Sequence, residues 1–96
     1  MQEKAVPEEL LPLREEIDRI DDEILSLLAK RFTVTAQVGE LKARHQLNSV
    51  DPVREQQKLE RLKERALEQG LKGEFVTELF QRIFDEVVMN HRSYLK

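Results

Sequence analysis

The chain has 96 residues, of which 40% are hydrophobic and 36% charged, and this balance is typical of a single folded domain. A net charge of -3 argues against general affinity for nucleic acid, because phosphate binding requires a basic face. The absence of cysteine excludes a disulfide framework, a thiolate nucleophile and a cysteine-based zinc site.

The first residues of the chain contain no apolar run as long as the core of a signal peptide. A run of about 18 apolar residues, which a membrane helix needs, occurs nowhere in the sequence. We therefore expect a cytoplasmic chain that does not associate with membranes. Residues 1–9 are expected to be disordered.

Apolar residues recur at alternating spacings of four and three in the first part of the chain. The set is Leu13, Ile17, Ile20, Ile24, Leu27, Val34, Val38 and Leu41. Pro12 suits a first helical turn, because its missing N–H would have no partner there. The pattern predicts one helix over residues 12–44, a rod of about 50 Å at roughly 1.5 Å per residue.

Two shorter helices are predicted after this rod. Asp51 stands at an N-cap position before Pro52, and Gly70 is a suitable stop, which gives a helix over residues 52–69. A strong 3.6-residue apolar pattern predicts the third helix over residues 74–94. No strand or repeat is indicated, so the fold class is all-α in a single domain.

The long helix is expected to expose an apolar seam. Two shorter helices can cover only part of a rod of that length, and a domain of this size buries a modest core by itself. The exposed seam is therefore expected to meet a second copy of the chain in a homodimer.

Two cations interrupt this seam. Arg31 takes the place of an apolar residue, and Lys42 follows it by about 20° around the helix and roughly 16 Å along it. Buried charge is costly unless it is paired. Arg31 either leaves the seam for solvent, pairs with a glutamate or meets an anion, and Lys42 either stabilises the helix end or shares that anion.

The turn before the second helix offers a third cation. Asp51 and Glu55 can be explained as acids at a helix N-terminus, but Arg54 opposes the helix dipole there unless an anion lies against it. Arg14 lies about 25 Å from Arg31 along the rod and about 100° round from it. Arg14 and Arg31 of one chain therefore cannot hold one small ligand, whereas Arg14 of a second chain could approach Arg31.

These residues occur, in order, in a pattern that closely resembles the all-helical type II chorismate mutases. The stretches that carry the resemblance are LLPLREEIDRIDDEILSLLAKR, VGELKAR, DPVREQQKLERL and FVTELFQRIFDEVV. The resemblance runs from about Leu10 to His91. It implies an intertwined homodimer of three-helix chains in phenylalanine and tyrosine biosynthesis, with two active sites built across the interface and no cofactor or metal.

The resemblance also implies a role for each matching residue. Arg14 from the partner chain would join Arg31, Lys42 and Arg54 in binding a dicarboxylate. Asp51 and Glu55 would lie near the hydroxyl of the substrate chorismate, and the backbone of Val38 beside the ligand.

The reaction implied is the pericyclic rearrangement of chorismate to prephenate, which needs no nucleophile. Selecting the reactive conformer and placing cations near the ether oxygen accelerate it. Lys42 would sit at that oxygen, and Arg31, which fixes the orientation of the substrate, is also counted as catalytic.

Helix three departs from the family pattern at two positions. Val87 replaces a common serine, which removes a hydrogen bond to a substrate carboxylate. His91 replaces a glutamine or glutamate that donates to the ether oxygen. An imidazole can donate such a bond, and its protonation would then make turnover depend on pH. Alternatively, His91 lies on a fraying C-terminal turn.

Two other functions remain open on the sequence. The first is an isochorismate pyruvate lyase on the same scaffold. The second is a regulatory helical dimer that binds chorismate-like ligands without turnover. His45, alone in a polar loop, is expected to be solvated, and the two histidines have no metal-ligand spacing.

Overall fold

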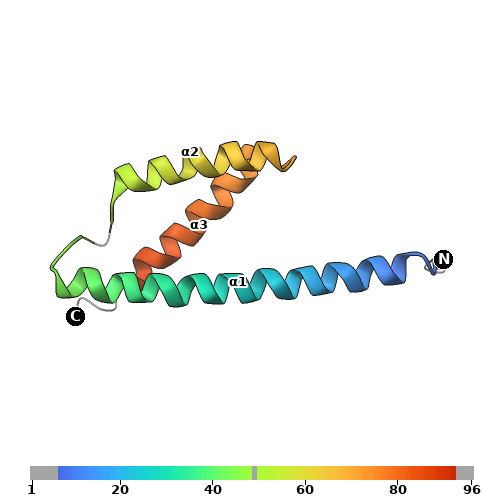
Figure 1. Ribbon diagram of the computed structural model, residues 1–96, viewed down its shortest axis with the longest axis horizontal. Helices are drawn as coiled ribbons and strands as arrows, with labels where there is room; N and C mark the ends of the chain where they lie inside the picture. Colours follow the sequence, from blue (N-terminus) through green and yellow to red (C-terminus); the bar gives the residue numbers. More distant parts are fainter. Residues whose placement is uncertain (1–6, 49, 93–96) are drawn as a thin grey trace, which may run out of the picture. The chain divides into compact units, whose positions relative to one another are not determined.

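The computed structural model describes residues 7–48 and 50–92, with the side chain of Arg92 outside the description. The chain folds into three helices, α1 (Leu10–Arg44), α2 (Pro52–Glu68) and α3 (Gly73–Arg92), and the described residues contain no strand (Figure 1). The predicted all-α class with one long and two shorter helices is confirmed. The intertwining of two chains stays a prediction.

The helix bounds differ slightly from the predicted ones. α1 begins two residues early, after a turn in which the Leu10 amide donates to the Pro7 carbonyl over 3.0 Å. Pro12 still lies among the first helical residues, whose N–H groups have no partner within the helix. Disorder was predicted for residues 1–9, of which residues 1–6 lie outside the described residues. The predicted end of helix three at Tyr94 also lies outside them.

The connection from α2 to α3 has the geometry of a helix stop. α2 ends at Glu68 instead of Gln69, and Gln69 is its C-cap. Gly70 follows with a φ of 77°, in the left-handed region that favours glycine. The chain reverses there and α3 begins at Gly73, one residue earlier than predicted.

The chain divides into two compact units, residues 1–33 and residues 34–96. In the described part of the first unit, α1 carries an apolar stripe that is open to solvent. Ile24 is 51% exposed and Leu27 is 65% exposed. The stripe also contains Leu13, Ile17 and Ile20, all exposed. The predicted seam is thus present, and no residue described in residues 7–33 covers it.

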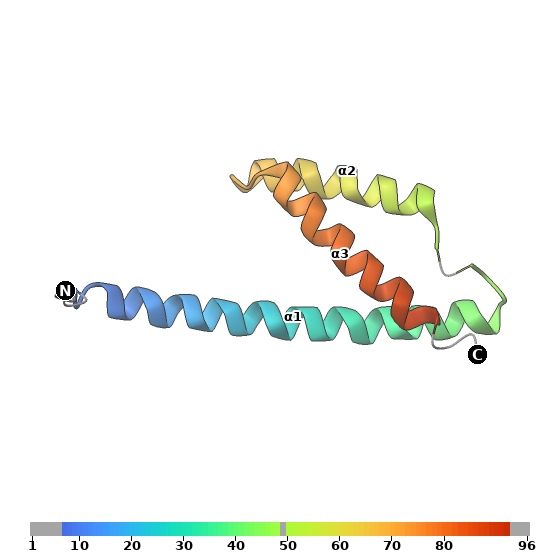
Figure 2. The ribbon, with the colours of Figure 1, turned by 180° about the vertical axis from the view of Figure 1, so that it is seen from behind.

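The second unit contains the end of α1 together with α2 and α3, which pack as a hairpin. The two helices lie closest near their connection and diverge toward their other ends (Figures 1 and 2). The small core comprises Ala66, Val76, Ile83 and Phe84. The rings of Phe80 and Phe84 on α3 lie in a tilted arrangement, with centroids 6.2 Å apart and ring planes inclined by 59°. This hairpin carries the predicted site residues of α2 and α3.

No described helix combines the length and the apolar character that crossing a membrane requires.

Candidate active site

The first unit contributes two predicted site residues, both on α1. Arg14 is exposed. Arg31 is half-buried, and this burial lowers the pKa of its guanidinium because the charged form loses solvation. Arg31 is therefore not fully solvated. A binding role for this partly desolvated cation stays a prediction.

The second part of α1 carries Val38 and Lys42. Lys42 is half-buried, in contrast to the exposed Leu41 beside it, whereas Val38 is 42% exposed. Gly39 is buried between them. Lys42 thus lies on the more buried side of this segment, as the seam pattern predicted, while its place in the last turn also suits the helix dipole.

The turn before α2 has the predicted cap. The Asp51 carboxylate accepts a hydrogen bond of 3.1 Å from the Arg54 backbone amide, and Pro52 occupies the first helical position. Glu55 is half-buried and Arg54 is exposed. The capping role of Asp51 is confirmed, and it holds the Arg54 backbone in place.

His91 on α3 has an interaction that the sequence did not reveal. Its side chain is only 5% exposed, and its Nε2 lies 2.9 Å from the carbonyl oxygen of Thr35 on α1. A carbonyl only accepts, so Nε2 carries the proton and donates. α3 continues through Arg92. His91 thus lies in the last turn of α3 with its ring buried, and the alternative of fraying at this turn stays untested.

Gly39 makes this approach possible. A Cβ added at Gly39 would lie 2.5 Å from Cδ2 and 2.8 Å from Nε2 of His91, which is closer than any ordinary contact. Glycine inside a helix costs about 1 kcal/mol relative to alanine, so a mid-helix glycine is a signal of close approach. Sequence reasoning missed both Gly39 and Thr35, and this signal could have found Gly39.

Val87 lies one helical turn before His91 and is half-buried. The two residues share the face of α3 that also carries Phe80 and Phe84. Val87 offers this face no polar atom, so any ligand there must find its hydrogen bonds elsewhere.

Within the second unit, the structure brings some of the predicted residues together. His91 packs against Gly39, the neighbour of Val38, and Asp51 is bonded to the backbone of Arg54. Arg14 and Arg31 belong to the first unit. A shallow depression on α1, lined by Asp22, Glu23, Ser26 and Leu27, contains none of the predicted site residues, and its two acids make it unsuitable for an anion.

Comparison with known proteins gives one family. The family model for chorismate mutase type II matches residues 13–92, which is most of the chain.

Individual relatives agree with this match. The chain is 36% identical over 78 residues to the T-protein of Enterobacter agglomerans, covering 81% of this chain and 21% of that protein. It is 38% identical over 81 residues to the bifunctional chorismate mutase/prephenate dehydratase of Aquifex aeolicus, covering 84% of this chain and 22% of that protein. It is 34% identical over 87 residues to the protein of the same name from Escherichia coli strain K12, covering 91% and 22%.

The chain thus spans about a fifth of the length of these relatives. The matched segment, residues 13–92, includes every predicted site residue from Arg14 to His91. The all-helical fold, the half-buried Arg31 and Lys42 and the capped turn at Asp51 are consistent with that match. The chain belongs to the type II chorismate mutase family.

Proposed function

We propose that the chain is a chorismate mutase that rearranges chorismate to prephenate in the biosynthesis of phenylalanine and tyrosine. The observation that carries this proposal is the family match over residues 13–92, which contains the whole ordered set of cations. The bifunctional relatives are named for the same activity.

The reaction breaks a C–O bond and forms a C–C bond in one concerted step. It needs no proton donor, nucleophile or metal, so the protein can act by holding the reactive conformer and by stabilising charge. A side chain placed where the ether oxygen gains negative charge lowers the barrier. We assign this role to Lys42 and to His91.

The substrate has two carboxylates, and the arginines suit them. A guanidinium presents a rigid fork of N–H donors that matches a carboxylate, and the pair is stronger where water is partly excluded. Half-buried Arg31 provides such a site. Arg54, held by the Asp51 cap, provides a second, and Arg14 a third.

The remaining predicted residues complete the binding site. Half-buried Glu55 and the free oxygen of the Asp51 carboxylate are assigned to the substrate hydroxyl. The backbone at Val38 and the side chain of Val87 line the bound ligand, with Val87 providing apolar contact only.

The active form proposed is a homodimer with Arg14 donated across the interface. Two observations support it. The apolar stripe of the first unit, including Ile24 and Leu27, is exposed, and such a stripe on a long helix is stabilised when it packs against another helix. Arg14 is also about 25 Å from Arg31 along the same helix, so one small ligand can meet both only if they come from different chains.

A second candidate function rests on the bond from His91 to Thr35. In the neutral imidazole the Nε2 proton is engaged by that carbonyl and Nδ1 carries none. Donation to an ether oxygen then requires either protonation of the ring or loss of the bond. A dimer that binds chorismate with little turnover is therefore the alternative.

The test is turnover by the purified chain, measured as loss of chorismate absorbance and formation of prephenate, together with calorimetry of chorismate binding. Turnover supports the mutase. Binding without turnover supports the second candidate. A parallel incubation with isochorismate tests the lyase, and pyruvate release faster than prephenate formation would replace the mutase by that function.

A further inference from the structure

A row of cations runs along one face of α2. Arg54, Lys58, Arg61 and Arg65 are separated by four, three and four residues, so they lie within about 60° of each other around the helix. The row is about 16 Å long. We call these four residues the α2 cationic row.

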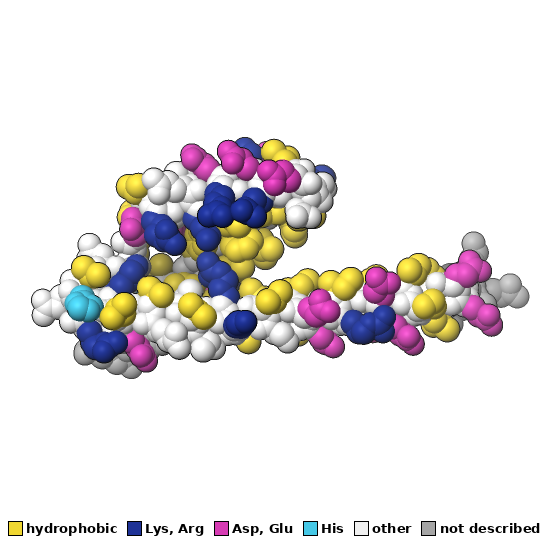
Figure 3. Space-filling view, in the orientation of Figure 1, with side chains coloured by type: hydrophobic (Ala, Val, Ile, Leu, Met, Phe, Trp, Pro, Cys, Tyr) yellow, Lys and Arg dark blue, Asp and Glu magenta, His cyan; other side chains and the backbone are white. Residues whose placement is uncertain are grey.

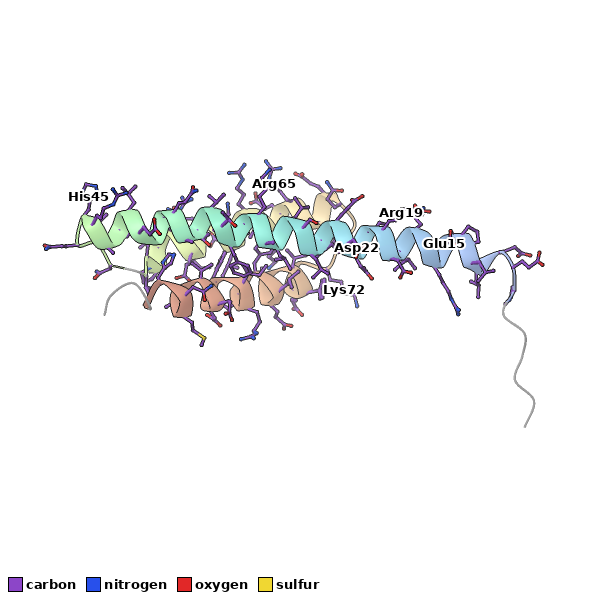
Figure 4. All side chains as sticks on the ribbon, turned by 90° about the horizontal axis from the view of Figure 1, so that it is seen from below. Glu15, Arg19, Asp22, His45, Arg65 and Lys72 are labelled. Carbon is purple, nitrogen blue, oxygen red and sulfur yellow. The ribbon has the colours of Figure 1, made fainter. Side chains whose placement is uncertain are left out.

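The charges on α2 are segregated. Glu60, Glu64 and Glu68 follow one another at intervals of four on a neighbouring face, and the Glu60 carboxylate accepts a hydrogen bond from Gln56. In the space-filling view, Lys and Arg side chains gather along one edge of α2 while acids occupy the opposite edge (Figure 3). Arg65, at the far end of the row, extends from α2 on the side away from α3 (Figure 4).

The charge pairs within α2 both stabilise and destabilise the helix. Neighbouring cations of the row repel each other, whereas Lys58, Arg61 and Arg65 each have a glutamate three residues away, at Glu55, Glu64 and Glu68. The feature that favours an anion outside the helix is the alignment of four cations on one face, beginning at Arg54.

The row begins at a residue already assigned to the substrate. Arg54 lies in the first turn of α2 beside the Asp51 cap, and Arg61 and Arg65 continue from it as exposed side chains, while Lys58 is half-buried. A chain with a net charge of -3 repels a dianion at long range, and only a local positive potential can reverse this. The α2 cationic row creates a local positive potential of this kind. Arg54, at one end of the row, is the residue assigned to the substrate.

We propose that Lys58, Arg61 and Arg65 guide the dicarboxylate substrate along α2 to Arg54. These residues raise the local concentration of the dianion at the site without touching the reacting atoms. This role rests on the proposed function, and it predicts an effect on kcat/KM through KM, with kcat preserved.

The test compares the wild-type chain with Arg61→Gln/Arg65→Gln, which removes the two exposed cations farthest from Arg54. The control is Lys72→Gln/Arg82→Gln, which changes the net charge equally at exposed positions outside α2. Turnover of chorismate is measured at ionic strengths from about 10 mM, where charges act over roughly 30 Å, to about 0.5 M, where the range is a few ångströms. Circular dichroism verifies the helix content of each variant.

At about 10 mM ionic strength, kcat/KM of Arg61→Gln/Arg65→Gln is expected to fall by about 10-fold, with kcat within about twofold of the wild type. The difference shrinks to less than about twofold at 0.5 M. The control stays within about twofold of the wild type throughout. Charge reversal in Arg61→Glu/Arg65→Glu is expected to deepen the loss at low salt and to leave kcat unchanged.

Four results would overturn the proposal. An unchanged salt dependence in Arg61→Gln/Arg65→Gln, beside an active wild type, rejects the guiding role alone and leaves the mutase in place. An equal loss in the control attributes the effect to net charge. If sedimentation velocity shows that the Arg61→Gln/Arg65→Gln dimer dissociates, the row contributes to the contact between chains instead. Absence of turnover in the wild type removes the proposed function and the guiding role together.

Discussion

His91 and Thr35 are joined by a hydrogen bond of 2.9 Å that ties α3 to α1, with the imidazole Nε2–H as donor. Within α1 the same carbonyl is the expected acceptor of the Gly39 amide, and a carbonyl oxygen has two lone pairs to serve both. Gly39 has no side chain, which leaves room for the imidazole ring of His91. His91, to which a catalytic donor role is assigned, thus also makes a structural contact between two helices.

The first prediction is that turnover is limited by the N–H donors available at His91. A neutral imidazole has one N–H, and in the structure that N–H is donated to the Thr35 carbonyl. No N–H of the neutral ring is then left for the ether oxygen.

His91→Gln tests this directly, because an amide has two N–H donors. Its kcat is expected to exceed that of the wild type by about 10-fold. If kcat of His91→Gln does not exceed that of the wild type, the donor role assigned to this position is wrong.

The second prediction concerns the packing of Gly39 on His91. In Gly39→Ala the new Cβ would collide with the ring, and such overpacking costs about 1–3 kcal/mol, against a gain of about 1 kcal/mol from helix propensity. The free energy of unfolding, measured by urea at fixed protein concentration, should therefore fall.

The control for Gly39→Ala is the same change made in a His91→Ala background, where no ring remains to collide. There the substitution should be neutral or stabilising by up to about 1 kcal/mol. Equal losses in both backgrounds would show that the contact with His91 is not the cause.

The third prediction separates the two roles of Asp51. Asp51→Ala should lose about 1 kcal/mol of stability with its N-cap, whereas Asp51→Asn should lose little, because asparagine caps equally well. If the carboxylate also binds the substrate hydroxyl, both variants lose kcat/KM by about 10-fold through weaker hydrogen bonding. Normal kcat/KM in Asp51→Asn would restrict this residue to capping.

The fourth prediction is that Arg14 acts across the dimer. Arg14→Ala and Lys42→Ala should each be nearly inactive alone. After unfolding and refolding as an equal mixture, about a quarter of wild-type activity should return, because half of the dimers are mixed and each mixed dimer has one intact site. No recovery, with mixed dimers confirmed by mass, would place Arg14 and Lys42 in sites of one chain.

The sequence was sufficient where the signals are local. Asp51 and Pro52 marked the start of α2 because a capping carboxylate and a proline act on their immediate neighbours. The apolar period placed α3 for the same reason. The half-burial of Arg31 was indicated only by its place in an apolar seam.

The contact of His91 with Thr35 and Gly39 could not be predicted in this way. It joins segments that are distant along the chain, and its only local trace is a glycine inside a helix. The sequence predicted the exposed stripe that includes Ile24 and Leu27, whereas the second copy proposed to cover it stays a prediction.

The most direct test is the chorismate mutase assay on the purified chain, with Arg31→Ala and Lys42→Ala beside it. The wild type should convert chorismate to prephenate, and each variant should lose about 100-fold or more in kcat/KM, since each removes a charged donor from a partly dry site. Both variants should keep the wild-type helix content. Prephenate formation that is absent in the wild type, or undiminished in both variants, would contradict the proposed function or its assigned residues.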